Sequence, residues 1–400
     1  MADFPHATNS PAGPGLLCRR LGAWIVFAIF LSGVVFRIAE YAADRSLWLD
    51  EAALASDILH QPLADLAAGR LHDSQVAPPG FALAVRLVTA IGGDSEPMLR
   101  LVSFVAGLAT LTIITLLAWH RLNPVGAAAT VALTAWSWPL IYYTNECKQY
   151  STDALWAVSL FALAGKILGQ SLTTRRAIAV GLAGCAALVF SQPALFGLAA
   201  LGLSGITSAA KSKQRGEMVR WAVLGAVWLM LFALQMALSF NSTLGNKVLF
   251  TYHQNTFLTL WPLEDARQGL HDVLLGDWVS ATAGTWQIWL GLLALGLWAG
   301  RQKHRQETVF IMLTLSGVAA ASLLHVYPLA VRLVLFLFPL LFWLVGQGAA
   351  ESAGWARGRA AWFVVPLLIW AAWPMGRDGV AVVRRPVAPE HLRPVAATLA

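Results

Sequence analysis

The stretch Ser46-Leu-Trp-Leu-Asp-Glu-Ala-Ala-Leu-Ala55 comes directly after the first long apolar run of the chain. It contains two adjacent acids, Asp50 and Glu51, at the start of a segment with a helical pattern. Adjacent residues of a helix point about 100° apart, so the two carboxylates can face one partner only at a helix start. A helix N-terminus also favours a carboxylate, and one interpretation is that Asp50 only caps the helix that runs on through Ile58. The position of this pair in the whole chain decides between a cap and a functional site.

The composition of the 400 residues indicates a membrane protein. Hydrophobic residues make up 58% of the chain and charged residues 12%, whereas about 25% of a soluble protein is charged. The mean hydropathy of +0.62 likewise excludes a water-soluble protein of two domains. The net charge of +7 does not indicate a nucleic-acid partner, because the basic residues lie between apolar runs, where they set the topology. Many of the 18 tryptophans lie near the ends of these runs, as interfacial anchors do.

We predict an all-α polytopic membrane protein of about eleven transmembrane helices, with a long first outer loop that carries juxtamembrane helices. The segment Phe81–Ile91 decides the topology. It is only about a dozen residues long, carries Arg86 and follows two prolines, so it is expected to be an interfacial helix rather than a span. Every strongly basic loop then lies with Arg19 and Arg20 on the cytoplasmic side. The predicted spans are Leu21–Val35, Met98–Trp119, Val125–Tyr142, Ser151–Leu168, Ala177–Phe190, Ala194–Ala209, Arg220–Phe240, Trp286–Ala299, Val309–Leu324, Leu333–Gly348 and Ala360–Trp373.

This topology divides the chain into three parts. Residues 1–20 are predicted to be a disordered cytoplasmic tail, residues 21–376 the transmembrane domain, and residues 377–400 a short outer segment. The three cysteines of the chain fall in different environments, so neither a disulfide nor a metal cluster is expected. The segments of the domain that collect on the outer face are 40–97, 143–150, 241–285 and 325–332.

The outer segments bring together charged residues from separate parts of the chain. The acidic pair lies in the first outer loop, and Arg100 begins the span that follows it. Lys148 lies in a polar run at the mouth of another span, where simple solvation explains such charges about as well as a function does. Arg332 lies two residues into an apolar run, a costly position for a cation, although snorkelling to the headgroups would also explain it. The outer face therefore combines one acidic pair with at least three cations.

An acidic base that faces several cations suits the transfer of a group from a phosphate-linked donor. The carboxylate can take the proton from an attacking hydroxyl. The cations can bind the phosphate and offset the charge that grows on it as it leaves. Because an oxocarbenium-like transition state needs no covalent nucleophile when the attack is in line, one base suffices for an inverting transfer.

Five short motifs between about residue 36 and residue 348 extend this interpretation. Each is weak alone, and their order and shared outer location carry the argument. Together they resemble the glycosyltransferase C superfamily, most of all the branch of protein O-mannosyltransferases and lipid A aminoarabinose transferases. The motifs are Leu-Trp-Leu-Asp50-Glu51-Ala, Gln75-x-x-Pro78-Pro79, Arg100-Leu-x-Ser, Tyr142-x-x-Asn-Glu146-x-Lys148-x-Tyr150 and Tyr327-Pro-x-x-x-Arg332.

The resemblance implies an enzyme that transfers a sugar from a polyprenyl-phosphate carrier to a lipid, glycan or protein hydroxyl, at the outer face of a bacterial inner membrane. Asp50 matches the catalytic acid expected to activate the acceptor, and Glu51 matches a second acid of this branch. Lys148 and Arg332 would hold the carrier phosphate. Most members work without a divalent metal, so no cofactor is expected, although Asp50, Glu51 and His72 are residue types that bind metals. Further residues expected to line the donor site are Arg100, Glu146, Tyr150, Tyr327 and Gln75.

Two other functions stay open from the sequence. A transporter or flippase of a lipid-linked saccharide would have broken helices with charges near the middle of the membrane, whereas the acids of this chain collect on one face. A relative without activity is the other alternative, and the presence of Asp50, Lys148 and Arg332 argues against it. The loop Asn241–Thr285, which contains Tyr252-His253-Gln254-Asn255, matches no motif of the family. It belongs either to acceptor recognition or to an ordinary interfacial loop.

Overall fold

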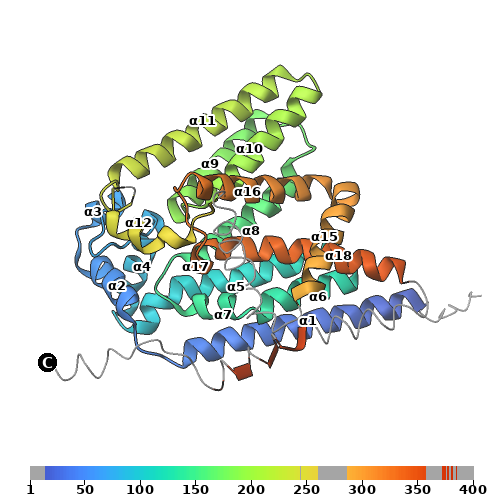
Figure 1. The fold of residues 1–400 in the computed structure, drawn as a ribbon, viewed down its shortest axis with the longest axis horizontal. Helices are drawn as coiled ribbons and strands as arrows, with labels where there is room; N and C mark the ends of the chain where they lie inside the picture. The colour runs from blue at the N-terminus through green and yellow to red at the C-terminus, as the bar shows by residue number, and fades with distance from the viewer. Residues whose placement is uncertain are drawn as a thin grey trace, which may run out of the picture.

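The structure, a computed structural model, describes residues 14–243, 245–259 and 286–356 and isolated positions between 372 and 384. The described residues form α-helices and short 3-10 helices without a strand (Figure 1). The first helix begins at Pro14, inside the predicted disordered tail. Three predicted segments lie wholly or mostly outside the described residues: the span Ala360–Trp373, the end segment 377–400 and residues 260–285 of the outer loop 241–285.

Long helices form the body of the protein, and their lengths and apolar character are those of a multi-pass membrane protein. Among the described residues, six helices are long and apolar enough to cross a membrane, or seven when one bent pair is counted as a span. The predicted number of eleven is therefore not confirmed. The helices of the body are α1 (Pro14–Ala42), α5 (Glu96–Arg121), α6 (Pro124–Trp136), α7 (Trp138–Tyr142), α8 (Tyr150–Ile167), α9 (Thr174–Phe190), α10 (Ala194–Lys211), α11 (Arg215–Leu238), α15 (Trp286–Lys303), α16 (Arg305–Leu323), α17 (Val331–Val334) and α18 (Phe338–Trp355).

Shorter helices gather at one end of the body, on the left of Figure 1. The segment that decided the topology forms α4, a helix of only 14 residues, in agreement with the prediction. Arg86 of α4 donates hydrogen bonds to the carbonyl oxygens of Ile58, at 2.9 Å, and of Leu59. These bonds satisfy carbonyls that the end of a helix leaves without partners, and they fix α4 to its neighbour. The helices at this end are α2 (Leu49–His60), α3 (Leu63–Ala68), α4 (Pro79–Gly92) and α12 (Lys247–His253). The described 3-10 helices are η1 (Tyr143–Asn145), η2 (Gln254–Thr256) and η4 (Leu335–Leu337).

An apolar cluster of its own fixes α2 against α4 and α5. Leu54, Ile58, Phe81 and Val85 have no exposed surface, and Leu99 of α5 is 2% exposed. Burying a side chain of this size contributes about 1.5–3 kcal/mol. Packing against α4 and α5 therefore holds α2, whose first turn carries the acidic pair, in a fixed position.

A bend between α6 and α7 leads the chain to the segment whose Cys147 N–H bonds Glu51 of α2. Between α6 and α7 the axis bends by 59°, just before Pro139, which cannot donate the hydrogen bond that would continue α6. The last carbonyls of α6 are bonded instead by Arg37 of α1, which reaches Thr134 O at 3.0 Å and Ala135 O at 3.1 Å. The chain then continues through α7 and η1 into the segment with Lys148.

Close contact between α15 and α18 fixes the position of α18. A Cβ atom on Gly296 would lie 1.8 Å from the carbonyl oxygen of Leu344, and one on Gly348 would lie 1.9 Å from that of Leu292. Only glycine permits this approach of two backbones, a packing mode common between membrane helices. The contact holds α18, and the 3-10 turn η4 joins α18 to α17, which carries Arg332.

Candidate active site

The first turn of α2 presents its two acids to different partners. The residue that caps α2 is Trp48, whose side chain makes no capping hydrogen bond, and Asp50 lies inside the first turn. The interpretation of Asp50 as a helix cap is therefore wrong. Adjacent positions on a helix point in different directions, and Asp50 and Glu51 accordingly belong to two separate clusters.

The first cluster surrounds the carboxylate of Asp50 with donors from three other parts of the chain. Lys148 Nζ lies 3.1 Å and Gln75 Nε2 3.0 Å from Oδ1 of Asp50, and Arg332 Nη1 lies 3.2 Å from Oδ2. Lys148 also donates to Gln75 Oε1 at 2.5 Å. The structure thus brings together four residues that the sequence predicted for the site, although up to 282 positions separate them. We call Asp50, Gln75, Lys148 and Arg332 the Asp50 cluster.

The Asp50 cluster is partly open and carries an excess of positive charge. The Asp50 side chain is 26% exposed and that of Arg332 20%, whereas Lys148 is 3% exposed. Burial by itself raises the pKa of Asp50, but Lys148, Gln75 and Arg332 together lower it below its ordinary value. Burial lowers the pKa of Lys148 against the opposing effect of Asp50. One carboxylate between two cations leaves a net positive site, which suits an anionic ligand.

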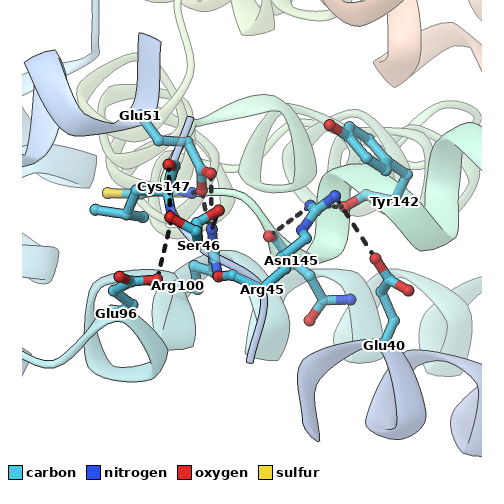
Figure 2. A network of polar contacts seen from close by, with 10 residues as sticks. Glu40, Arg45, Ser46, Glu51, Glu96, Arg100, Tyr142, Asn145 and Cys147 are labelled. Carbon is cyan, nitrogen blue, oxygen red and sulfur yellow. Dashed lines mark hydrogen bonds and ion pairs between the residues drawn. The ribbon is translucent and has the colours of Figure 1, made fainter. Parts of the chain in front are cut away.

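The second cluster contains Glu51 and Arg100 and is completely buried (Figure 2). Arg100 binds Glu51 through two nitrogens, with Nε 2.9 Å from Oε1 and Nη2 2.7 Å from Oε2. Its remaining bonds go to the carbonyl oxygens of Arg45 at 2.6 Å and Ser46 at 3.3 Å. Glu51 also accepts the backbone N–H of Cys147 at 2.7 Å. This placement does not favour the predicted contact of Arg100 with the donor phosphate, because its guanidinium is already engaged by the protein.

A third arginine holds the segment that leads to Lys148 (Figure 2). Arg45 donates to the carbonyl oxygens of Asn145 at 2.8 Å and Tyr142 at 3.4 Å, and its guanidinium lies 4.1 Å from the centre of the Tyr142 ring. Glu146 follows, with no exposed surface. Burial and the charge of Glu51 raise the pKa of Glu146 to about 7. The structure thus places Glu146, which was predicted to line the donor pocket, in the protein interior, two positions before Lys148 in the chain.

Two tyrosines that the sequence predicted for the donor site, Tyr150 and Tyr327, pack against other parts of the protein. Tyr150 is 5% exposed, and its ring meets that of Tyr143 edge to face at 5.2 Å. The hydroxyl of Tyr327 donates to the carbonyl oxygen of Leu333 at 2.7 Å, next to Arg332 in the chain. Tyr327 therefore fixes the turn on which Arg332 stands.

The described part of the outer loop 241–285, which the sequence left unexplained, also reaches the Asp50 cluster. The Tyr252 ring lies 5.6 Å from the guanidinium carbon of Arg332, and the ring of His253 packs on Tyr252 at 4.8 Å. Burial and the charge of Arg332 lower the pKa of His253 to about 4, while Asp50 opposes this shift. The Tyr-His pair was visible in the sequence, but its contact with a residue 80 positions away was not.

Hydrogen bonds at both ends of the segment 242–256, which contains Tyr252, fix it to two other parts of the chain. Ser242 accepts the backbone N–H of Leu71 at 3.1 Å and donates to its carbonyl oxygen at 3.0 Å. At the other end, Leu329 N–H donates to Thr256 O at 2.8 Å, three residues before Arg332. The segment therefore links the loop of Gln75 to the turn of Arg332.

The third residue considered as a metal ligand lies apart from the acidic pair. Nδ1 of His72 is 3.0 Å from Asp57 Oδ1, and its backbone N–H donates to Asp57 Oδ2 at 2.7 Å. His72 is thus directed to Asp57 and not to Asp50 or Glu51. Within the part of the chain that the structure describes, no group of three His, Cys, Asp or Glu residues is placed to hold a metal ion.

Comparison with known proteins finds similarity in the fold rather than in the sequence. No protein-family model and no characterised protein sequence matches the chain. The structure is similar to that of ArnT from Cupriavidus metallidurans in the apo state, with 16% identity and a TM-score of 0.54. This match covers 92% of the present chain and 74% of ArnT.

A second similarity is to the oligosaccharyltransferase AglB from Archaeoglobus fulgidus, in complex with an inhibitory peptide and a dolichol-phosphate. The identity is 11% and the TM-score 0.51, and the match covers 90% of this chain but only 56% of AglB. The chain thus spans little more than half of the archaeal enzyme. Both proteins are members of the glycosyltransferase C superfamily, so the fold that the sequence motifs indicated is confirmed.

Proposed function

We propose that the protein is an inverting membrane glycosyltransferase that moves a sugar from a polyprenyl-phosphate donor to an acceptor hydroxyl. The observation that carries this proposal is the Asp50 cluster. It holds a carboxylate next to a lysine and an arginine, at distances of 3.1 and 3.2 Å, at a partly exposed position. A base beside a phosphate-binding pair is the minimum that such a transfer requires.

The reaction follows from the roles of these groups. Asp50 accepts the proton of the acceptor hydroxyl while the acceptor oxygen bonds to the anomeric carbon of the sugar. The bond from that carbon to the phosphate oxygen breaks, and its electron pair stays on the phosphate. Lys148 and Arg332 stabilise the additional negative charge on the departing polyprenyl phosphate. Attack on the face opposite to the phosphate inverts the anomeric configuration.

The buried residues of the predicted site would act by positioning. Glu51 joins α2 to α5 through Arg100 and to the segment before Lys148 through Cys147 N–H. These contacts set the distance between the base and the lysine. We accordingly assign Glu51 and Arg100 to the support of the site, and Asp50, Lys148, Arg332 and Gln75 to direct contact with the substrates.

The shared fold supports this proposal. ArnT and AglB are membrane glycosyltransferases, and the AglB structure contains a dolichol-phosphate. A carrier of the same chemical class is a consistent partner for an apolar helical body with a cationic site at one end. We further propose that the site faces the outside of the cytoplasmic membrane and that the N-terminus lies inside, as the distribution of the basic loops predicts.

Mass spectrometry of the lipid that co-purifies with the wild type and with Asp50→Asn tests the proposal. A polyprenyl phosphate in the wild type and its sugar-loaded form enriched in the variant would support the transferase and identify the sugar. A pyrophosphate-linked oligosaccharide present equally in both would favour the transporter. Bulk phospholipid alone in both samples would contradict the assignment of a polyprenyl-phosphate donor to this site.

A further inference from the structure

We propose that Asp50 and the phosphate of the donor compete for the same two cations, so that Asp50 is released as an active base only after the phosphate has bound. This inference rests on the proposed function and adds an order of events to it. Donor binding comes first, and activation of the acceptor follows.

The contacts in the Asp50 cluster carry the inference. Each oxygen of the carboxylate is engaged by one cation, Oδ1 by Lys148 and Oδ2 by Arg332. Gln75 adds a further hydrogen bond to Oδ1 at 3.0 Å. A carboxylate whose two oxygens are both ion-paired is a weak acceptor for another proton. In this state the group expected to act as the base is occupied by the residues expected to bind the substrate.

Both cations can still receive a phosphate. The ammonium of Lys148 has three donors, and in the described residues they meet Asp50 and Gln75 only. The guanidinium of Arg332 has five N–H donors, and within the described part of the chain its one ion pair is with Asp50. An incoming phosphate oxygen can therefore bind both residues in a bridging position, and each contact it makes weakens the attraction that holds Asp50.

Other groups around Asp50 do not compensate for the lost cations. His253 of α12 faces the cluster, and it carries no charge near neutral pH because its pKa is about 4. Tyr150 of α8 is also near enough to Asp50 for their charges to interact, and it is neutral as a phenol. Gln75 is uncharged, so its hydrogen bond to Asp50 does not replace a cation. With a phosphate in place, Asp50 faces an added negative charge, which increases its tendency to take a proton.

The same competition gives a route for product release. After transfer, Asp50 holds the acceptor's proton and is neutral, while the phosphate has become a monoester with one more negative charge. Loss of that proton restores the carboxylate, which again attracts Lys148 and Arg332 and weakens their hold on the polyprenyl phosphate. The ion pairs of the free enzyme are in this sense the final state of the cycle.

Equilibrium binding of undecaprenyl phosphate in detergent tests the inference without any transfer reaction. Because coupling between two ligands is reciprocal, removing the competing charge must tighten phosphate binding. We expect Asp50→Asn and Asp50→Ala each to lower the Kd by about tenfold, within the usual range of such couplings. Asp65→Asn is the matched control, since Asp65 lies in the same loop and pairs with the exposed Arg70. It should leave the Kd unchanged.

Two further variants separate the inference from the proposed function. Lys148→Met and Arg332→Gln should raise the Kd, and adding Asp50→Asn to Lys148→Met should recover less than Asp50→Asn gains alone. A Kd that is unchanged or higher in both Asp50 variants, with folding verified by Tm, would overturn the competition while leaving the phosphate site intact. If neither Lys148→Met nor Arg332→Gln altered the Kd, the proposed function itself would fail.

Discussion

Asp50 and Glu51 are neighbours in one helical turn, yet they belong to regions of opposite character. Glu51 has no exposed surface and is held by two nitrogens of Arg100 and one backbone amide. Asp50 is 26% exposed and is held by single contacts from two cations and one amide. The buried pair is satisfied by the protein itself, whereas the open cluster has donor capacity left for a ligand. Charge alone therefore does not identify a catalytic acid, and the state of its partners does.

The largest effect should come from breaking the buried pair. Arg100→Met leaves the Glu51 carboxylate in the interior without its cation, and losing one partner of such a pair typically costs about 3–5 kcal/mol. Glu51→Gln should be similarly damaging, because Arg100 then lacks an anion. Thermal unfolding in detergent measures both variants. A Tm close to that of the wild type in both would show that the pair does not support the fold.

Substitution in the Asp50 cluster should impair function more than stability, in contrast to Arg100→Met. We expect Lys148→Met to raise the KM for the lipid donor about 10- to 100-fold, equivalent to roughly 1.4–2.8 kcal/mol. The Tm should fall much less than in Arg100→Met, because Lys148 serves a ligand site. Steady-state kinetics with a fixed acceptor gives the KM. A fall in Tm as large as that of Arg100→Met would place Lys148 with the structural group.

The pH dependence of stability should report on Glu146, a buried acid close enough to Glu51 for their charges to interact. The pKa of Glu146 rises from 4.5 to about 7 in the folded protein, mainly through burial and then through Glu51. The protonated form therefore stabilises the fold fully below about pH 4.5, and this contribution is lost as the pH rises through 7. Tm measured from pH 4.5 to pH 8 should decline in the wild type and be flatter in Glu146→Gln. Equal slopes in the two proteins would refute the assignment.

The smallest effect should come from the aromatic ring beside the cluster. Tyr252→Leu removes the ring 5.6 Å from Arg332, a contact worth about 0.5–1 kcal/mol at an exposed position. The donor KM should rise about two- to fivefold, while Tyr252→Phe, which keeps the ring, should behave as the wild type. An equal loss in Tyr252→Phe would assign the effect to the hydroxyl group instead.

Much of this arrangement could be predicted from the sequence because hydropathy and basic loops follow local rules. The all-helical membrane fold, the short α4 and the grouping of Asp50, Gln75, Lys148 and Arg332 were all predicted. The division between Asp50 and Glu51 was not, because it depends on whether each side chain turns towards the site or towards α5. Arg45 and Arg37 were missed for the same reason, since both bond to carbonyl groups about 100 positions away.

The contact of Tyr252 and His253 with the cluster was also beyond the sequence. Their loop has no apolar periodicity and matches no motif, and its position depends on Ser242, Thr256 and their distant partners. The predicted number of eleven spans stays unconfirmed, because six or seven helices among the described residues meet both the length and the hydropathy requirements. Helix α9, for example, lies at a predicted span, but its 17 residues do not meet the length requirement.

The most direct test of the contrast between the two acids is the turnover of Asp50→Asn per folded molecule, measured beside Glu51→Gln. Asparagine keeps the shape of Asp50 and removes only the charge and the base. The account predicts a loss of transfer of about 10²–10⁴-fold in Asp50→Asn with the Tm retained, as for the loss of a general base. Sugar transfer at the wild-type rate by folded Asp50→Asn would contradict the central claim.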